Sequence, residues 1–435
     1  MVGSSDTMEI TASLFANLPE GWNAKRFGDI LAEPVRNGIY KKKDFHGHGA
    51  KVVNMGELFA YGFISNQKMD RIELNDRERQ AYLLQDGDLL FARRSLVLEG
   101  SGKCSLVVCP SEETTFESSI IRARLSQIEA DPRFYYYFWA SPFGRALMAS
   151  IATRTAVSGI RGSELMQLKV PIPSLLTQRK IAAVLSAYDD LIENNTRRIA
   201  LLEEMARLVY HEWFVRFHFP GHESVRLVDS PLGPIPEGWE VVRLGQVADV
   251  NAETVKRGEE PEEIDYIDIA SVSMGQIKEI KHFAFDDAPG RARRVVRHGG
   301  IIWSTVRPNR KSYCLILNPS PNLIISTGFA VISARQAPYM YLYHALTAEE
   351  FVGYLTNHAT GSAYPAVLAS DFANADILLP PKSLLEAFHN VAVDLFDKRE
   401  NLMQRNALLR RTRDLLLPRL VSGAPDVSEM EIDVS

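Results

Sequence analysis

Apolar residues recur in steps of four and three along two long segments of this chain, residues 181–213 and 388–420. This spacing predicts two amphipathic helices, and an unbroken 4,3 series is typical of a coiled-coil seam. Each segment follows prolines, which are tolerated at a helix start and disfavour helix just before them. The apolar seam positions are Ile181, Leu185, Ile192, Ile199 and Leu202 in the first segment, and Leu395, Leu402, Leu409 and Leu416 in the second.

The second predicted helix has polar residues in its seam, at Arg399, Asn406 and Arg413. A polar seam residue costs stability but can fix register and partner. Residues 203–204 are acidic and the equivalent residues 410–411 are basic, which suits pairing between the two helices, although the sequence does not show their direction. The alternative is two separate amphipathic helices, each packed on its own domain.

The helices end two copies of one larger repeat. The motif PEGW with a following Arg and Gly occupies residues 18–28 and returns at 235–245. A glycine followed by an apolar stretch recurs at 87–91 and 299–303, and Arg-x-Ala-Leu-Leu recurs at 198 and 405. Three matches in the same order indicate two diverged copies, each running from a turn through a strand to a long helix.

Between the turn and the helix, each copy has short apolar runs bounded by glycine or polar residues, which predict strands. Regular alternation of strand and helix is absent, so the sequence predicts a mixed sheet rather than a dinucleotide-binding fold. The predicted class is α+β, with two repeated mixed α/β domains and two long helices paired as a coiled coil. Predicted strands are 89–92, 105–108, 119–123 and 301–303, and predicted helical stretches are 133–150 and 339–356.

These patterns divide the chain into six parts. The predicted parts are a first domain at 18–173, a central helix at 174–217, a linker at 218–234, a second domain at 235–380, a C-terminal helix at 381–421 and an acidic tail at 422–435. The linker is predicted from its proline and glycine content.

The net charge of −5 at first disfavours a nucleic-acid partner, because such proteins usually carry excess basic charge. Its distribution changes that interpretation. Residues 424–435 hold four acidic and no basic residues, residues 1–17 hold two acidic and no basic residues, and the remainder is close to neutral. Three cysteines without a CxxC pair disfavour a disulfide framework and a zinc site. With no signal-like or membrane-spanning stretch, we expect a cytoplasmic protein.

The usual catalytic signatures are missing from the sequence. Residues 100–103 read GSGK but lack the first glycine and the hydroxyl of a phosphate-binding loop, so a turn is the better interpretation. His46 and His48 lack a third ligand nearby. We therefore expect a non-catalytic chain without a metal site.

Basic charge is concentrated in each copy. Residues 278–311 hold nine basic against three acidic residues, and residues 36–51 hold a similar excess. Such patches favour phosphate contacts, and Arg or Asn within them can read base edges. A solvated charged face is the alternative interpretation, but two such domains joined by long helices favour two half-sites read at a fixed spacing.

The layout of residues 18–423 resembles the specificity subunit of Type I restriction–modification enzymes. The resemblance rests on the twin PEGW openings, on GGIIWSTVRPN at 299–309, on VPIPSLLTQRKI at 170–181 and on LPRL at 417–420. Thr177 departs from the family, which usually has Glu there, and the second helix entry at 381–388 departs further.

The resemblance implies that each domain reads one half of a split sequence in double-stranded DNA. The helices would set the half-site spacing and dock two modification subunits that methylate flipped adenines. Restriction subunits would complete an ATP-dependent endonuclease. S-adenosylmethionine, ATP and Mg would bind those partners, and this chain would hold no cofactor. A protein-interaction scaffold is the competing class.

The family's base-reading residues vary, so the candidate DNA contacts come from local charge and position alone. Arg307 and Asn309 lie in a pattern that the family shares, so we expect them to hold the loop rather than choose bases. The candidates in the first copy are Lys41, Lys42, Lys43, His46, Arg93 and Arg94, with Arg154 and Arg161 second; those in the second copy are Arg291, Arg293, Arg294, Arg307, Asn309, Arg310 and Lys311, with Tyr364 second.

Overall fold

The computed structural model describes residues 15–153 and 158–433. The chain forms two compact units. Unit 1 consists of Met1–Asn195 and Gln404–Ser435, and unit 2 consists of Thr196–Met403. Both long helices therefore contribute to both units. No helix within the described ranges is long and apolar enough to cross a membrane.

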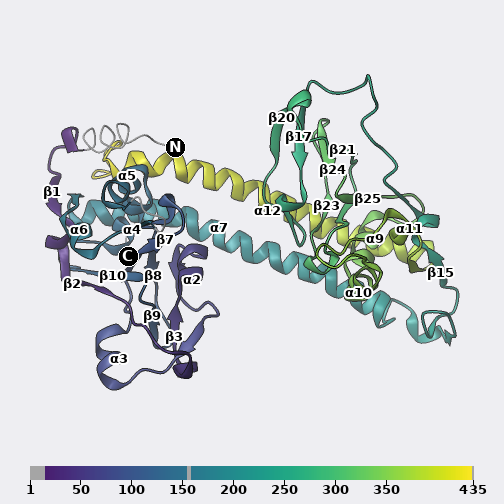
Figure 1. Cartoon of the computed structure of the whole chain (residues 1–435), viewed down its shortest axis with the longest axis horizontal. Helices are drawn as coiled ribbons and strands as arrows, with labels where there is room; N and C mark the ends of the chain where they lie inside the picture. The colour runs from purple at the N-terminus through teal and green to yellow at the C-terminus, as the bar shows by residue number, and fades with distance from the viewer. Residues whose placement is uncertain (1–14, 154–157, 434–435) are drawn as a thin grey trace. The chain divides into compact units, whose positions relative to one another are not determined.

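Unit 1 is built around two larger sheets (Figure 1), each with both parallel and antiparallel strand pairs. The five-stranded sheet has the order β2-β10-β6-β8-β4 and is antiparallel except for the β4–β8 pair. The three-stranded sheet has the order β5-β3-β9, with β3 parallel to β9. The strands are β2 (Leu31–Asn37), β3 (His46–Val53), β4 (Phe63–Ile64), β5 (Asp70–Ile72), β6 (Leu89–Ala92), β7 (Arg94–Ser95), β8 (Cys104–Val107), β9 (Thr114–Phe116), β10 (Ile120–Leu125) and β11 (Ser158–Gly159).

The core of unit 1 lies between the larger sheet and its helices. Phe27, Phe91 and Trp139 meet edge to face with ring centroids 5.1–6.0 Å apart, and all three are fully buried. Edge-to-face contact is a preferred aromatic geometry, which makes this cluster well packed. The helices are α2 (Met55–Ala60), α3 (Asp76–Tyr82), α4 (Pro132–Ala140), α5 (Pro142–Ile151) and α6 (Gly162–Gln167).

Unit 2 repeats this plan with two four-stranded sheets. Their orders are β16-β25-β22-β23 and β20-β17-β24-β21, and β17 is parallel to β24 as β3 is to β9. The strands are β13 (Leu227–Val228), β14 (Ile235–Pro236), β16 (Ala248–Val250), β17 (Glu263–Ile267), β18 (Val272–Ser273), β19 (Gln276–Ile277), β20 (Lys281–Ala284), β21 (Ala292–Val295), β22 (Gly300–Ser304), β23 (Tyr313–Ile316), β24 (Leu323–Ser326) and β25 (Phe329–Ala334).

The helices of unit 2 are α8 (Leu244–Val247), α9 (Tyr339–Thr347), α10 (Glu349–His358) and α11 (Ala369–Ala373). The two predicted helical stretches are each divided into two helices, which is a correction. Ser141 is extended because a proline follows it, and its hydroxyl caps α5 by accepting the Gly144 N–H (3.3 Å). Ala348 is extended between α9 and α10 without a proline, and the local sequence marks that break only by the acidic pair Glu349-Glu350 in the first turn of α10.

The PEGW motif forms the same turn in both units. The Trp22 N–H donates to the Pro19 carbonyl, and the Trp239 N–H donates to the Pro236 carbonyl, each at 3.1 Å. The glycine in each turn has a positive φ, +83° and +87°, which other residues adopt at a cost. The turn leads into a strand that pairs with the strand preceding a long helix: β1 (Asn23–Arg26) with β12 (Lys169–Ile172), and β15 (Glu240–Arg243) with β26 (Asp376–Leu379). Each copy is thereby closed on itself.

The two predicted long helices are present, as α7 (Leu175–Tyr210) and α12 (Lys382–Val421), drawn in teal and yellow in Figure 1. A short π-helical turn, His211–Val215, follows α7. Every predicted seam position is buried or half-buried. The buried positions are Ile181, Leu185, Ile192 and Leu402, and the half-buried ones are Ile199, Leu202, Leu395, Leu409 and Leu416.

Within unit 1 the helices pair antiparallel. Asn195 Nδ2 donates to Asn406 Oδ1 at 2.9 Å, while Asp189, earlier on α7, pairs with Arg413, later on α12. Both asparagines are buried. Two of the polar seam residues therefore find partners across the seam, which satisfies groups that would otherwise be costly to bury.

Within unit 2 the direction is the same. Arg399 is 6% exposed and pairs with Glu203 at 2.5 Å, while Trp213 and Phe388 lie with ring centroids 6.2 Å apart. The acidic residues 203–204 and the basic residues 410–411, whose opposite charges suit pairing of the helices, do not pair with each other in the ion pairs seen across the seam. Because the helices are antiparallel, positions related by the repeat do not face each other, and Glu203 meets a seam arginine instead.

The described parts of the segments after the long helices occupy equivalent places in the two units. In unit 2, Phe217 and Phe219 each pack on Trp239, at 5.4 Å between ring centroids. In unit 1, Val427 of the acidic tail is buried in the same core as the PEGW turn, and the Ser428 carbonyl accepts from Lys180 Nζ at 2.6 Å. The tail therefore packs against its unit through an apolar residue.

Candidate nucleic-acid interface

In unit 1, three chain segments meet where strand β6 ends. The Arg93 N–H donates to the Ser119 carbonyl (2.8 Å), and the Arg93 carbonyl accepts from the Ile160 N–H (3.0 Å). Directly afterwards, β7 pairs antiparallel with β11. The tertiary structure thereby brings Arg93 and Arg94 beside the segment that carries Arg161.

Unit 2 forms the same junction where β22 ends. The Thr305 N–H donates to the Gly328 carbonyl, and the Thr305 carbonyl accepts from the Val367 N–H, each at 2.9 Å. Val306 then forms a bridge with Ala366. In unit 1, the segment with Arg161 therefore lies against the segment with Arg93 and Arg94. In unit 2, the segment with Tyr364 lies against the loop that begins after β22.

The unit 1 junction presents free guanidinium groups. Arg94 and Arg161 are exposed, and half-buried Arg93 donates from Nη1 to the Ser118 carbonyl (3.3 Å). None of the three forms an ion pair with an acidic side chain in the described part of the chain. Arg154 lies outside the described residues.

The three lysines before β3 differ in their exposure and in their ion-pair partners. Lys41 Nζ lies 2.7 Å from a Glu78 carboxylate oxygen and 4.9 Å from the centre of the Phe45 ring. The hydrogen bond from Lys41 lowers the pKa of Glu78. Lys42 and Lys43 are exposed and have no ion-pair partner among the described residues. Lys41 is therefore partly neutralised, whereas its neighbours remain available.

His46 is exposed at the start of β3, and its Nε2 lies 3.3 Å from the Lys41 carbonyl oxygen. This segment begins beside the junction, because the N–H groups of Gly38 and Ile39 donate to the carbonyls of Ile120 and Phe116 (3.0 Å each). The candidate residues of unit 1 thus lie on two neighbouring loops.

Two exposed apolar side chains flank these basic residues and were missed at the sequence level. Tyr40 is 78% exposed directly before the lysine run, and Leu96 is 86% exposed just after Arg94 and Ser95. Apolar side chains among phosphate-binding residues can contact bases or unstack them. An apolar residue next to a basic run was the only available sequence signal.

In unit 2, Arg307 organises the loop after β22. Its φ of +52° is left-handed, and its N–H donates to the Pro365 carbonyl at 2.7 Å. Its Nη2 donates to the Ala363 carbonyl (2.9 Å), and the guanidinium lies 4.6 Å from the centre of the Tyr364 ring. These contacts offset a backbone strain of about 1–2 kcal/mol. Arg307 and Tyr364 form one stacked pair at the loop.

The tip of the same loop is exposed. Asn309 and Arg310 project without an acidic partner among the described residues. Lys311 is also left-handed, with φ +54°, and its Nζ lies 2.5 Å from a Glu349 oxygen. Arg310 therefore carries a free positive charge, and the charge of its neighbour is matched.

The remaining basic candidates of unit 2 lie on or before β21. The Arg291 carbonyl accepts from the Thr327 N–H (2.8 Å), which places exposed Arg291 beside the junction. Arg293 lies 5.2 Å from the centre of the Phe285 ring. Arg294 is half-buried, and desolvation lowers its pKa. The three are therefore not equivalent, and Arg291 is the most available.

Residues 15–153 and 158–433 contain no group of three or more His, Cys, Asp or Glu side chains arranged to hold a metal ion. Cys104 and Cys314 are buried and Cys109 is exposed, all as free thiols. The chemistry that both junctions offer is that of exposed guanidinium, ammonium and amide donors, which suits contacts to phosphates and base edges.

Comparison with known proteins gives matches over part of the chain and over nearly all of it. Residues 19–204 match the family described as Type I restriction modification DNA specificity domain. The specificity subunit of Type I restriction enzyme MjaIX from Methanocaldococcus jannaschii is 24% identical over 421 residues, which cover 95% of each chain. The EcoKI specificity subunit of Escherichia coli K12 is 32% identical over 172 residues, 38% of this chain and 36% of its own.

The fold has a counterpart among solved structures. The crystal structure of a Type-I restriction-modification system S subunit from M. genitalium matches with a TM-score of 0.56 and 15% identity, covering 93% of this chain and 96% of that one. This likeness shows the fold, and the similarity to the MjaIX subunit extends over nearly the whole chain. Residues 19–204 therefore match a Type I restriction modification DNA specificity domain, and the chain as a whole is similar to Type I restriction enzyme specificity subunits.

Proposed function

We propose that this chain is the non-catalytic DNA-recognition subunit of a Type I restriction–modification complex, in which each copy of the repeat reads one half of a bipartite DNA site. The observation that carries the proposal is the repeated junction: in both units the same strand end presents basic side chains that have no acidic partner among residues 15–153 and 158–433. Exposed cations of this kind contact phosphates and fix the protein on the duplex.

The two junctions differ at the positions that would meet base edges. Unit 1 presents Leu96 beside Arg94, whereas unit 2 presents Asn309 beside Arg310, for which we propose a phosphate contact. Asn309, expected from the sequence to hold the loop, is exposed at its tip. Asn can bond bidentately to adenine in the major groove, and apolar groups contact the thymine methyl. The two units share one framework but carry different loops, which suits the reading of two different half-sites. The long helices would set the spacing between these half-sites.

Partner docking is supported by a second apolar stripe on the long helices. In unit 2, Leu201 and Leu208 of α7 are 62% and 46% exposed; in unit 1, the repeat-related Leu408 and Leu415 of α12 are 65% and 63% exposed. Exposed apolar residues one to two turns apart on a helix commonly mark a protein interface. One stripe in each copy suits two modification subunits per chain.

In the assembled enzyme, the modification subunits would bind S-adenosylmethionine, and restriction subunits would bind ATP and Mg. The complex would act in the cytoplasm, where bacterial or archaeal DNA is accessible. This chain would contribute recognition and assembly, and the partners would carry out the chemistry.

Methylome sequencing of a host with and without this chain, in the presence of the modification subunit, tests the proposal. We expect adenine methylation at one split motif to disappear without the chain. Methylation that is unchanged without the chain, or a single undivided motif, would contradict the proposed role.

Assembly can be tested separately by light scattering of the chain with the modification subunit. Leu408→Asp should reduce two modification subunits per chain to one, and combining it with Leu201→Asp should remove both. Leu232→Asp is the matched control, because Leu232 is 50% exposed but lies outside the long helices. Retention of both modification subunits by the double variant would mean that the stripes are not the docking surface.

A further inference from the structure

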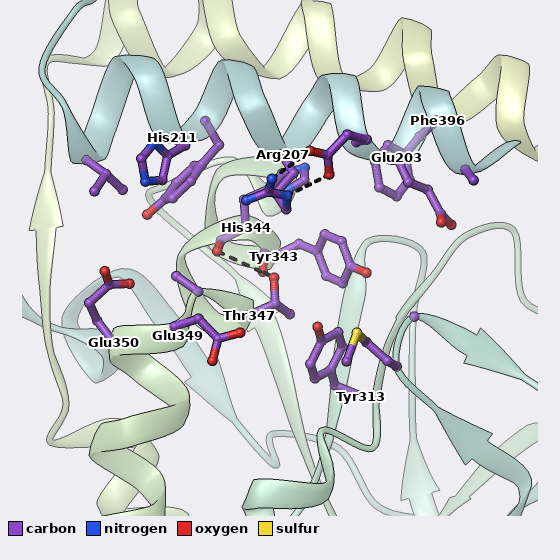
Figure 2. Close-up of a pocket in the computed structure, with 17 residues that line it drawn as sticks. Glu203, Arg207, His211, Tyr313, Tyr343, His344, Thr347, Glu349, Glu350 and Phe396 are labelled. Atoms are coloured by element: carbon purple, nitrogen blue, oxygen red, sulfur yellow. Dashed lines mark hydrogen bonds and ion pairs between the residues drawn. The ribbon is translucent and has the colours of Figure 1, made fainter. Parts of the chain in front are cut away.

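Unit 2 contains a cavity of about 440 Å³ that the DNA-binding role does not use. Side chains of α7, α9 and α10 face this space in Figure 2, together with Tyr313 of β23 and Phe396 of α12. A volume of this size is in the range of small-molecule and side-chain binding sites.

Four carboxylates line the cavity, and three of them form ion pairs, so one negative charge is left unmatched among the described residues. Glu203 and Glu204 from α7 and Glu349 and Glu350 from α10 line it, with Arg207 as the guanidinium among them. Glu204 pairs with Arg207. Glu203 pairs with Arg399 of the seam, and Glu349 pairs with Lys311 of the loop. Glu350 alone has no ion-pair partner within the described ranges. The site therefore favours one monovalent cation and disfavours an anion.

Aromatic rings form much of the wall. Tyr210, Tyr313 and Tyr343 line the cavity, and none of their hydroxyl groups forms a hydrogen bond in the described part of the chain. Tyrosine faces attract cations, and free hydroxyls accept hydrogen bonds from N–H donors. A planar guanidinium, which stacks on rings and donates several hydrogen bonds, matches this wall better than a compact ammonium.

His344 gives an independent indication of a ligand. It lines the cavity, is 6% exposed, and its Nε2 is buried without a hydrogen-bond partner. Burial lowers its pKa to about 3, so the ring is neutral and does not repel a cation. An unpartnered buried polar group is rare and needs an explanation.

The equivalent position in unit 1 shows which residue is sufficient for packing at the place of His344. Tyr135 of α4 donates to the Pro171 carbonyl (3.0 Å), and Tyr341 of α9 donates to the Leu378 carbonyl (2.6 Å), so these tyrosines are equivalent. Three residues further on, unit 1 has Phe138, which is fully buried, and unit 2 has His344. Phenylalanine fills this place in the fold, so packing alone does not call for a histidine.

We propose that the cavity receives the guanidinium group of an arginine side chain from the modification subunit. The proposal rests on the proposed function and deepens it. Glu204, on the cavity wall, lies one helical turn from Leu208 of the exposed stripe. A partner lying along the stripe can therefore extend an arginine into the cavity.

Ligand-observed NMR with Nα-acetyl-L-arginine amide tests the chemistry of the site. We expect saturable binding to the full chain, and binding at least about tenfold weaker for the neutral isostere Nα-acetyl-L-citrulline amide. Glu350→Gln and His344→Phe should weaken arginine-probe binding by about tenfold or more. Glu350 is exposed, so its variant keeps the test valid if His344→Phe fails to fold. Equal binding of the two probes, or unchanged binding in Glu350→Gln, would overturn the proposal.

The affinity of the modification subunit identifies the source of the cation. Glu350→Gln should weaken this affinity by about tenfold, and excess arginine probe should compete with the partner. Glu240→Gln is the matched control, since Glu240 is an exposed carboxylate of unit 2 that does not line the cavity. Probe binding with unchanged assembly would assign the site to a free small cation and overturn the partner assignment. If the wild-type chain does not assemble at all, the proposed function fails instead.

Discussion

Replacement of Arg310 by alanine should weaken DNA binding and reduce its dependence on salt. The structure separates this residue from its neighbour: Arg310 is exposed without an acidic partner, whereas Lys311 lies 2.5 Å from Glu349. A side chain that neutralises one phosphate contributes about 0.9 to the slope of log affinity against log salt. Arg310→Ala should therefore make the slope shallower by about 0.9, and Lys311→Ala should change it less.

The change in salt dependence can be expressed as a ratio of affinities. Between about 50 and 200 mM salt, one lost phosphate contact reduces the salt-induced drop in affinity by about 3.5-fold. Fluorescence anisotropy with the assembled methyltransferase complex, at four or more salt concentrations, resolves such a difference. Glu349→Gln should release the Lys311 ammonium and make the slope steeper.

Two results would refute this reasoning. An unchanged slope for Arg310→Ala would mean that the loop tip does not contact a phosphate. Equal slopes for the variants at Arg310 and Lys311 would mean that pairing with Glu349 does not neutralise the lysine in the complex.

Three further predictions concern the helix pair, a surface ion pair and assembly. Asn406→Leu should lower the free energy of unfolding by about 1–3 kcal/mol, because it leaves the Asn195 amide buried without its acceptor. Adding Asn195→Leu should recover most of this loss, as measured by urea unfolding. If the losses of the two variants add instead, the pairing is contradicted. Lys41 lowers the pKa of Glu78, so the pair stabilises the fold above pH 4.5, the ordinary pKa of the group, and this contribution is lost as the pH falls through the lowered pKa. The difference in melting temperature between wild type and Lys41→Met should therefore shrink on acidification. A difference that stays constant with pH would exclude the pair as its cause. Leu202→Asp places a carboxylate in the half-buried seam and should prevent assembly with modification subunits on size-exclusion chromatography, whereas normal assembly would mean that an intact seam is not needed for docking.

Much of the framework was predictable from local pattern. The 4,3 spacing identified the long helices and every seam position, because burial of one helix face imposes that period. The PEGW turns and the strand at 89–92 follow from glycine conformation and from a short apolar run. The break at Ala348 was missed because no proline or glycine marks it.

The candidate contacts were harder to rank, because availability depends on partners that are distant in sequence. Lys41 and Glu78 are separated by 37 residues, and Lys311 and Glu349 by 38. Composition counts all of these lysines as equal positive charges. Only the folded structure shows which charges are already matched.

The sequence by itself determined the repeat, the mixed α/β class, the two long helices and their seam, because these depend on periodicity and on residues close along the chain. The tertiary structure decided the antiparallel direction of the pairing within each unit, the junction that joins Arg93 to Ile160, and the contrast between His344 and Phe138. Each of these depends on contacts between segments remote in sequence, and no local propensity encodes which remote group a side chain will meet.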